Sequence, residues 1–288
     1  MTQLQAILFA CVGSSLLGAS AIFVRLSDLG PIATGFYRML FALPILAVWM
    51  MWERQEELIH SVFPIKHKGL LFLGGAFFAL DLALWNWSID YTTIVNSTLF
   101  NNTAAFFVPL IMWIGFSQKP TLQYSLAALI GFAGCVCLVG ESFSISYTNL
   151  LGDLVALLSG FVVALYLVAL KFIRADTATG FIMFWTGFVA VLLLFALSYL
   201  FGESFSPLTL KDIVSIFGQA IFVHTLGQSL LAYSLGKIPA NYTAVILFLA
   251  PVTGALLGWL IYDEALNTIK IIGIVLIMVS IVAVKTKS

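Results

Sequence analysis

Asp81-Leu-Ala-Leu-Trp-Asn-Trp-Ser-Ile-Asp-Tyr-Thr-Thr-Ile-Val-Asn-Ser-Thr-Leu-Phe-Asn-Asn102 places a carboxylate, two tryptophans and a row of asparagines within an otherwise apolar sequence. This pattern predicts the end of one membrane-spanning helix, a tight turn and the start of the next helix. Unpartnered polar groups at membrane depth cost several kcal/mol each, so they persist mainly where they face a cavity or each other. We therefore expect this hairpin, and an echo of it over residues 227–255, to line a solute pathway.

The composition of the chain excludes a water-facing globular protein. Of its 288 residues, 61% are hydrophobic and 9% are charged, whereas soluble domains carry about 25% charged residues. The apolar runs are long and continuous, which favours transmembrane helices over the alternating strands of a β-barrel. The formal net charge is zero, so the chain offers no basic surface for nucleic acid. We expect an all-α membrane protein surrounded by a lipid bilayer.

The apolar runs divide into ten segments of roughly the length that crosses a bilayer as a helix. We predict transmembrane helices at about 5–25, 31–52, 68–88, 93–116, 122–140, 149–171, 178–201, 212–235, 239–262 and 268–285. Five of these helices lie in residues 1–143 and five in residues 144–288, within one compact membrane domain.

The Lys and Arg residues predict the orientation of these helices. With the N-terminus inside, nine cations fall on the inner side and three on the outer side, and Arg38 lies within the second segment. The inner group is Arg54, Lys66, Lys68, Lys119, Lys171, Arg174, Lys237, Lys285 and Lys287, and the outer group is Arg25, Lys211 and Lys270. Because cytoplasmic loops carry an excess of Lys and Arg, we expect both termini to be cytoplasmic, in the inner membrane of a bacterium.

The two halves of the chain come into register when the sequence is displaced by 146 residues. The matched pairs are Arg25 with Lys171, Trp87 with Tyr233, Trp113 with Trp259 and Phe116 with Tyr262. Because each half holds an odd number of segments, the second copy enters the membrane from the opposite side. Such inverted repeats are typical of alternating-access transporters, whose substrate site lies near the midplane between the repeats.

Arg38 in the second segment and the stretch Gly258-Trp-Leu-Ile-Tyr-Asp-Glu264-Ala-Leu-Asn267, followed by Gly273, resemble the drug/metabolite transporter superfamily and its EamA-type ten-helix members. The first half departs from this pattern, with Gln118 in place of the glutamate and Ala127 in place of the glycine. The resemblance implies ten helices, with the fifth and tenth at the periphery and a central cavity between the other eight. It also implies export of amino acids or other metabolites, without naming one of them.

Several polar side chains are candidates for substrate binding. Arg38, Asp81 and the pair Asn101 and Asn102 all lie roughly 10 Å below the outer surface, at a helical rise of 1.5 Å per residue. We expect Arg38 and Asp81 to interact, directly or through one residue or water, because lone charges at this depth are expensive. The pair either holds two helices together permanently, or leaves Asp81 to meet a substrate ammonium or shuttle a proton.

Aromatic side chains extend this candidate site. Trp85 follows Asp81 by four residues and shares its helical face, so it is either a cation–π partner for the substrate or part of the interfacial aromatic belt. Tyr166 and Phe248 are candidates for further aromatic walls of the cavity.

His224 lies in the middle of the eighth segment, with Gln228 one turn further on the same face. Either the neutral histidine is hydrogen-bonded to a neighbour, or it binds substrate and titrates during the cycle, since the unperturbed pKa of histidine is about 6.5. Pro109 and Pro251 each remove a helix hydrogen bond, which creates a gating hinge or a fixed kink.

The sequence contains no phosphate-binding loop, catalytic signature or metal-ligand cluster, so we expect no cofactor and no metal. We predict a secondary transporter that exports small amphipathic metabolites such as amino acids, with a proton as a possible coupling ion. Three alternatives remain open. One is a channel, which needs a continuous pore rather than a cavity closed on one side. Another is an exchanger of a larger cationic or nucleoside-bearing metabolite. The third is a membrane enzyme acting on lipid head groups, with Asp81 and His224 as acid and base.

Overall fold

The computed structural model describes residues 2–24, 26–57, 68–139, 149–203, 205 and 208–284, and all regular elements in these ranges are helices. The elements are α1 (Gln3–Gly18), α2 (Ser20–Val24), α3 (Pro31–Glu57), α4 (Lys68–Tyr91), α5 (Ile94–Asn101), α6 (Ala104–Phe116), α7 (Leu122–Val139), α8 (Leu150–Ile173), α9 (Thr179–Leu200), α10 (Leu210–Gly218), the π-helix η3 (Gln219–Gln228), α11 (Ser229–Leu235), α12 (Ala240–Ile246), α13 (Leu249–Tyr262) and α14 (Thr268–Ala283).

Nine segments of the described chain are long and apolar enough to cross a membrane. Four of them combine consecutive elements: α1 with α2, α5 with α6, α10 with η3 and α11, and α12 with α13. The tenth predicted segment is the apolar helix α14, which at 16 residues is shorter than the other nine. The prediction of an all-helical chain is thereby confirmed for the described residues, and the predicted segments match the observed helices to within a few residues at their described ends.

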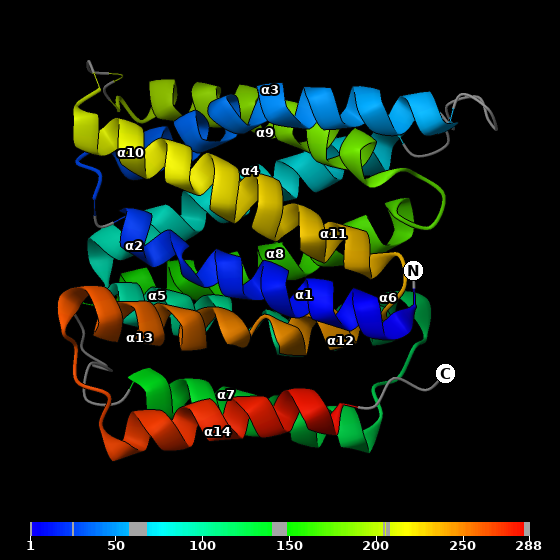
Figure 1. Ribbon diagram of the computed structural model, residues 1–288, viewed down its shortest axis with the longest axis vertical. Coiled ribbons are helices and arrows are strands. Elements are labelled where there is room, and N and C mark those ends of the chain that lie inside the picture. The colour runs from blue at the N-terminus through cyan, green and yellow to red at the C-terminus, as the bar shows by residue number, and fades with distance from the viewer. Residues whose placement is uncertain are drawn as a thin grey trace.

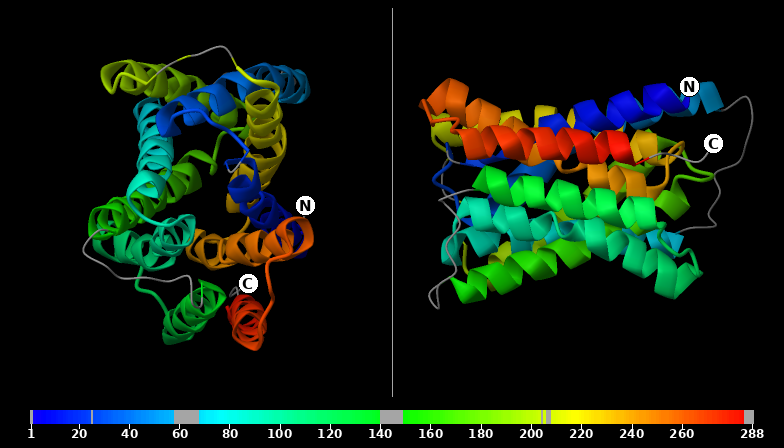
Figure 2. Two further views of the ribbon diagram at one scale, coloured as in Figure 1. Left: turned by 90° about the vertical axis from the view of Figure 1, so that its left-hand side faces the viewer. Right: turned by 90° about the horizontal axis from the view of Figure 1, so that it is seen from below.

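The helices lie roughly parallel or antiparallel to one another in layers (Figure 1). α3 packs against α9 at one edge of the molecule, α4 packs against α8, and α1 packs against η3, α11 and α13. α7 and α14 pack against each other and stand apart from the rest, as the end-on view shows (Figure 2). α1 begins and α14 ends at the same end of the bundle (Figure 1).

Glycines set the closest approach between α7 and α14. A Cβ atom on Gly134 would lie 2.7 Å from the carbonyl oxygen of Gly273, and a Cβ on Gly273 would lie 2.6 Å from the carbonyl oxygen of Gly134. The two backbones are therefore in direct contact. Small residues permit this kind of packing between membrane helices, where association depends on close van der Waals contact.

Two glutamates tie the ends of α3 and α9 together. The Glu53 carboxylate, near the end of α3, accepts hydrogen bonds from the backbone N–H groups of Thr179 (3.2 Å) and Gly180, which begin α9. At the opposite end of the pair, Glu203 accepts from the N–H groups of Ile32 (3.1 Å) and Ala33 (2.6 Å), which begin α3. Each carboxylate satisfies two N–H groups that the first turn of a helix leaves unpaired.

The break between α5 and α6 lies just ahead of Pro109. Proline has no N–H, so the carbonyl of Ala105 loses its helical partner, and the Tyr124 hydroxyl of α7 donates to it instead at 2.5 Å. At the break itself, the Asn102 side chain donates to the carbonyl of Thr98 (2.8 Å) and the Thr103 hydroxyl donates to that of Phe100 (2.5 Å). The same two carbonyls also accept from the backbone N–H groups of Asn102 and Thr103, each at 3.1 Å, so the side-chain bonds add to the backbone bonds and stabilise the interruption.

The break between α12 and α13 has a similar origin. Pro251 cannot donate to the carbonyl of Leu247, which instead accepts from the N–H of Ala250 at 3.0 Å. The N–H of Phe248 likewise turns to the carbonyl of Val245, three residues earlier, at 3.1 Å. Each proline thus follows a tightened turn that divides one membrane segment into two helices.

Candidate functional site

Two adjoining cavities lie among the helices. The first, here called the central cavity, has a volume of ≈ 140 Å³ and carries the charged residues Arg38 and Asp81. The second, the end cavity, has a volume of ≈ 170 Å³, and its lining is mostly apolar but also includes Glu264 and Lys270. The two share the lining residues Leu17, Ser20, Trp85, Thr98, Asn102 and Ala250. The two cavities therefore adjoin each other at these residues.

Asp81 is held by a triangle of hydrogen bonds in the central cavity. Its Oδ1 accepts from the hydroxyl of Ser159 (2.6 Å) on α8 and from the side-chain amide of Asn101 (3.1 Å) at the end of α5. The same Asn101 amide also donates to the Ser159 oxygen at 2.7 Å. Both bonds to Asp81 fall on Oδ1, which leaves Oδ2 without a hydrogen-bond partner in the described part of the chain. The triangle fixes the carboxylate and keeps one of its oxygens available.

Arg38 of α3 lines the same cavity but has no hydrogen-bond or ion-pair partner among the residues that the structure describes. Only 6% of the residue is exposed, and its Nε is buried with no hydrogen-bond acceptor among the residues that the structure describes. Within those residues no ion pair joins it to Asp81, although the two lie within electrostatic range. Among the described residues the two side chains thus form no direct ion pair, because Ser159 and Asn101 hold the Asp81 carboxylate towards α8 and α5. An interaction through one residue or water, the other form of the sequence prediction, stays a prediction.

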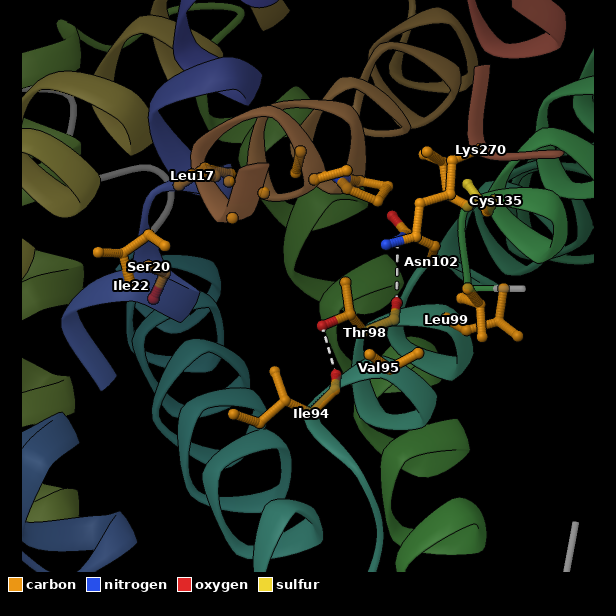
Figure 3. Close-up of a pocket in the computed structure, with 18 of the residues that line it drawn as sticks. Leu17, Ser20, Ile22, Ile94, Val95, Thr98, Leu99, Asn102, Cys135 and Lys270 are labelled. Carbon is orange, nitrogen blue, oxygen red and sulfur yellow. Dashed lines mark hydrogen bonds between the residues drawn. The ribbon is translucent and has the colours of Figure 1, made fainter. Parts of the chain in front are cut away.

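Trp85 and Asn102 line both cavities. Trp85 lies one turn beyond Asp81 on α4, as their spacing predicts. The Asn102 amide remains attached to the Thr98 carbonyl, beside the Thr98 hydroxyl and its bond to the carbonyl of Ile94 at 2.7 Å (Figure 3). Asn101 thus turns towards Asp81, while Asn102 belongs to the shared wall.

Tyr166 and His224 are buried beside the central cavity, and both rings contact Phe78 in a tilted arrangement. The ring of Phe78, which lines the cavity, lies 4.9 Å from the Tyr166 ring and 5.1 Å from that of His224. Tyr166 is 0% exposed and His224 is 1% exposed, and neither belongs to the lining of the two cavities. The Tyr166 hydroxyl and both His224 nitrogens are buried without hydrogen-bond partners among the described residues.

His224 and Gln228 both belong to the π-helix η3. Gln228 lines the central cavity, whereas His224 contacts it only through Phe78. π-helical turns are rare and occur frequently at functional sites. The alternative of a hydrogen-bonded structural histidine finds no bonding partner in the described residues.

Of the remaining predicted site residues, only Pro251 lines one of the two described cavities, and Phe248 and Pro109 do not. Phe248 is fully buried and packs against Gly131 of α7, so it does not line either cavity. Pro109 is buried within α6, where it determines the break at the start of that helix. Pro251 lines the end cavity.

Ser159 is a site residue that the sequence prediction omits. A single serine in the leucine-rich stretch of α8 has little to distinguish it. One usable signal is its position seven residues before Tyr166, which places the two on one helical face. In the described ranges, no group of three or more His, Cys, Asp or Glu residues is arranged to hold a metal ion.

Comparison with known proteins gives two matches to one family model. The model, described as the EamA-like transporter family, matches residues 4–140 and again residues 150–286. A protein of Archaeoglobus fulgidus described as an uncharacterized transporter is 28% identical over 265 residues, which cover 88% of each chain. The pseudopaline exporter CntI of Pseudomonas aeruginosa is 27% identical over 215 residues, which cover 74% of each chain.

The fold also resembles that of a solved structure, described as a crystal structure of a protein. The TM-score is 0.81 at 15% sequence identity, and the alignment covers 98% of this chain and 96% of the other. At this level of identity the likeness concerns the fold alone.

Proposed function

The chain belongs to the EamA-like transporter family, and we propose that it exports small amphipathic metabolites, such as amino acids, as a secondary transporter by alternating access. The observation that carries this proposal is the central cavity. Its walls come from both halves of the chain, with Arg38 and Asp81 from the first and Val163 and Gln228 from the second. A site between two halves can open to either side when the halves rock against each other.

We further propose ten transmembrane helices in two inverted repeats, residues 1–143 and 144–288, with α14 as the tenth. The two matches of one family model support this division. The reciprocal carboxylate caps also support it, because α3 and α9 are the second helix of each proposed repeat. Glu53 of α3 caps the start of α9, and Glu203, just after α9, caps the start of α3. The helix breaks at residues 102–103 and 247–248 fall at nearly corresponding positions.

Asp81 is the proposed contact for a substrate ammonium. Its free Oδ2 supplies the charge, and Trp85, one turn away in the same cavity wall, adds an aromatic face for a cation. Export is supported by a relative named as an exporter. We place the protein in a bacterial inner membrane with both termini in the cytoplasm. A membrane enzyme with Asp81 and His224 as acid and base receives no support, because His224 lies outside the cavity lining.

Counterflow in proteoliposomes tests this function. Vesicles that contain the purified protein and are loaded with an unlabelled amino acid should take up the labelled amino acid faster than protein-free vesicles. Asp81→Asn should reduce this exchange about tenfold or more, since it removes a charge-assisted contact. Asp90→Asn is the matched control, because Asp90 lies on the same helix, is exposed and does not line the cavities. Equal uptake with and without protein across a panel of amino acids would reject the proposal.

A further inference from the structure

We propose that Arg38 forms an anion subsite of the central cavity and receives the carboxylate of the transported solute, opposite the ammonium at Asp81. This inference rests on the proposed transport function and names its substrate class as zwitterionic amino acids with an apolar side chain.

The first step is the unsatisfied state of Arg38. A guanidinium has five N–H donors and remains protonated in proteins, and a buried charge without partners is expensive. The described residues supply no acceptor for its buried Nε and no carboxylate at ion-pair distance. Arg38 lines the cavity, so an anion that enters the cavity can reach it.

The second step is that no acidic side chain in the described cavity lining is bound to Arg38. Asp81 is the only acidic residue in the described lining of the central cavity, and Ser159 and Asn101 already hold its Oδ1. Tyr166 and His224 lie within electrostatic range of Arg38, but neither bonds to it. Arg38 and Asp81 thus do not form a permanent ion pair. They present two opposite charges separately to the same cavity.

The third step is the match to a zwitterion. Arginine presents parallel N–H groups that fit a carboxylate in a bidentate manner, and the free Oδ2 of Asp81 accepts from an ammonium. The charges of the lining sum to zero, as do those of a zwitterion. A solute whose ammonium and carboxylate meet these two groups is recognised at both ends of its charged head.

The end cavity accounts for the rest of the solute. It adjoins the central cavity at Leu17 and Ala250, and its walls include Leu99, Leu138 and Val139. Figure 3 shows the apolar side chains of Val95 and Leu99 close to the shared residues Asn102 and Thr98. An apolar side chain extending from the charged head would be buried there.

Matched ligands separate the two subsites. Phenylalanine, phenethylamine and 3-phenylpropionate share one apolar group and differ in their charged groups, and each is used as a competitor of labelled amino-acid counterflow. For the wild-type protein, we expect phenylalanine to compete at least about tenfold more strongly than phenethylamine, because the amine lacks the carboxylate. Arg38→Gln should abolish that preference, and Arg38→Lys, which keeps the charge without the planar fork, should retain part of it. Asp81→Asn should instead abolish the preference for phenylalanine over 3-phenylpropionate.

The measured quantity is a ratio within one variant, so it does not depend on how much protein folds or inserts. If Arg38→Gln weakens phenylalanine and phenethylamine by the same factor, Arg38 is structural and the inference is overturned, while the transport function stands. If the wild-type protein shows no counterflow of any amino acid, the proposed function and the subsite both fail.

Discussion

Ser117 and Asp263 lie 146 residues apart and share one backbone conformation, with φ angles of 57° and 53°. In the described part of the chain they are the only non-glycine residues with positive φ. Each follows the last residue of its helix, α6 or α13. The next N–H in each case bonds to a carbonyl six residues earlier, from Gln118 to Met112 and from Glu264 to Gly258. This local correspondence supports the proposed repeat at the level of single hydrogen bonds.

These left-handed positions predict opposite effects for glycine and alanine substitutions. Ser117→Gly and Asp263→Gly should each stabilise the protein by about 0.5–1 kcal/mol, because an L side chain is strained at positive φ. Gly202→Ala, at φ 68° and with open space around its Cβ, should destabilise it by about 1–2 kcal/mol. Gly115→Ala, in a helix and also in open space, is the control and should be stabilising. Thermal unfolding in detergent measures all four variants, and a gain from Gly202→Ala would contradict the argument.

Two buried serines should respond differently to the loss of a hydroxyl. Ser159→Ala removes the donor to Asp81 and should destabilise the protein by about 1.5–3 kcal/mol, as for a bond to a charged group. It should also weaken amino-acid counterflow by misplacing the carboxylate. Ser198→Ala removes a hydroxyl that has no partner among the described residues and should be neutral or stabilising. Similar stability losses in both variants would show that the Ser159 bond contributes little.

The Tyr124 hydroxyl should matter only while Pro109 is present. Tyr124→Phe leaves the carbonyl of Ala105 unpaired and should cost about 1–3 kcal/mol. In a Pro109→Ala background the helical N–H can return to that carbonyl, so the same substitution should cost much less. The coupling in this double-mutant cycle is measured by thermal unfolding. Additive effects of the two substitutions would mean that the tyrosine does not compensate for the proline.

Lys171 of α8 should stabilise the packing of α8 against the connection between α11 and α12. Its Nζ donates to the carbonyls of Leu235 (2.7 Å) and Ile238 (3.0 Å). Lys171→Met removes both bonds and should lower stability by about 1–3 kcal/mol, because it leaves two carbonyls without this donor. Lys237→Met, at an exposed position, should have little effect. An unchanged unfolding temperature in Lys171→Met would show that these bonds are replaced by water.

The membrane segments were predictable because a spanning helix must be apolar along its whole length. The break at Asn102 was harder to predict. Pro109 indicates that the helix is distorted, but it does not determine which of the preceding turns is interrupted. Here the turn that yields is the one where Asn102 and Thr103 can bond to backbone carbonyls.

The pairing of Arg38 with Asp81 could not be decided from depth alone. Counting residues along a helix gives the height of each side chain in the bilayer, but not the direction in which it points around the helix axis. Ser159 decides the direction of Asp81, and it lies 78 residues away in the sequence. For the same reason the sequence could not show that Phe248 faces α7 and lies outside the lining of both cavities.

The exchange of caps between α3 and α9 has a consequence for biosynthesis. The N–H group of Ala33 can form its hydrogen bond to Glu203 only after the ribosome has added a further 170 residues. The start of α3 therefore leaves the translocation machinery without the partner that it has in the finished protein. The starts of α3 and α9 each reach their final hydrogen bonding only when the other half is present, so this pair of helices matures only after both halves have been made.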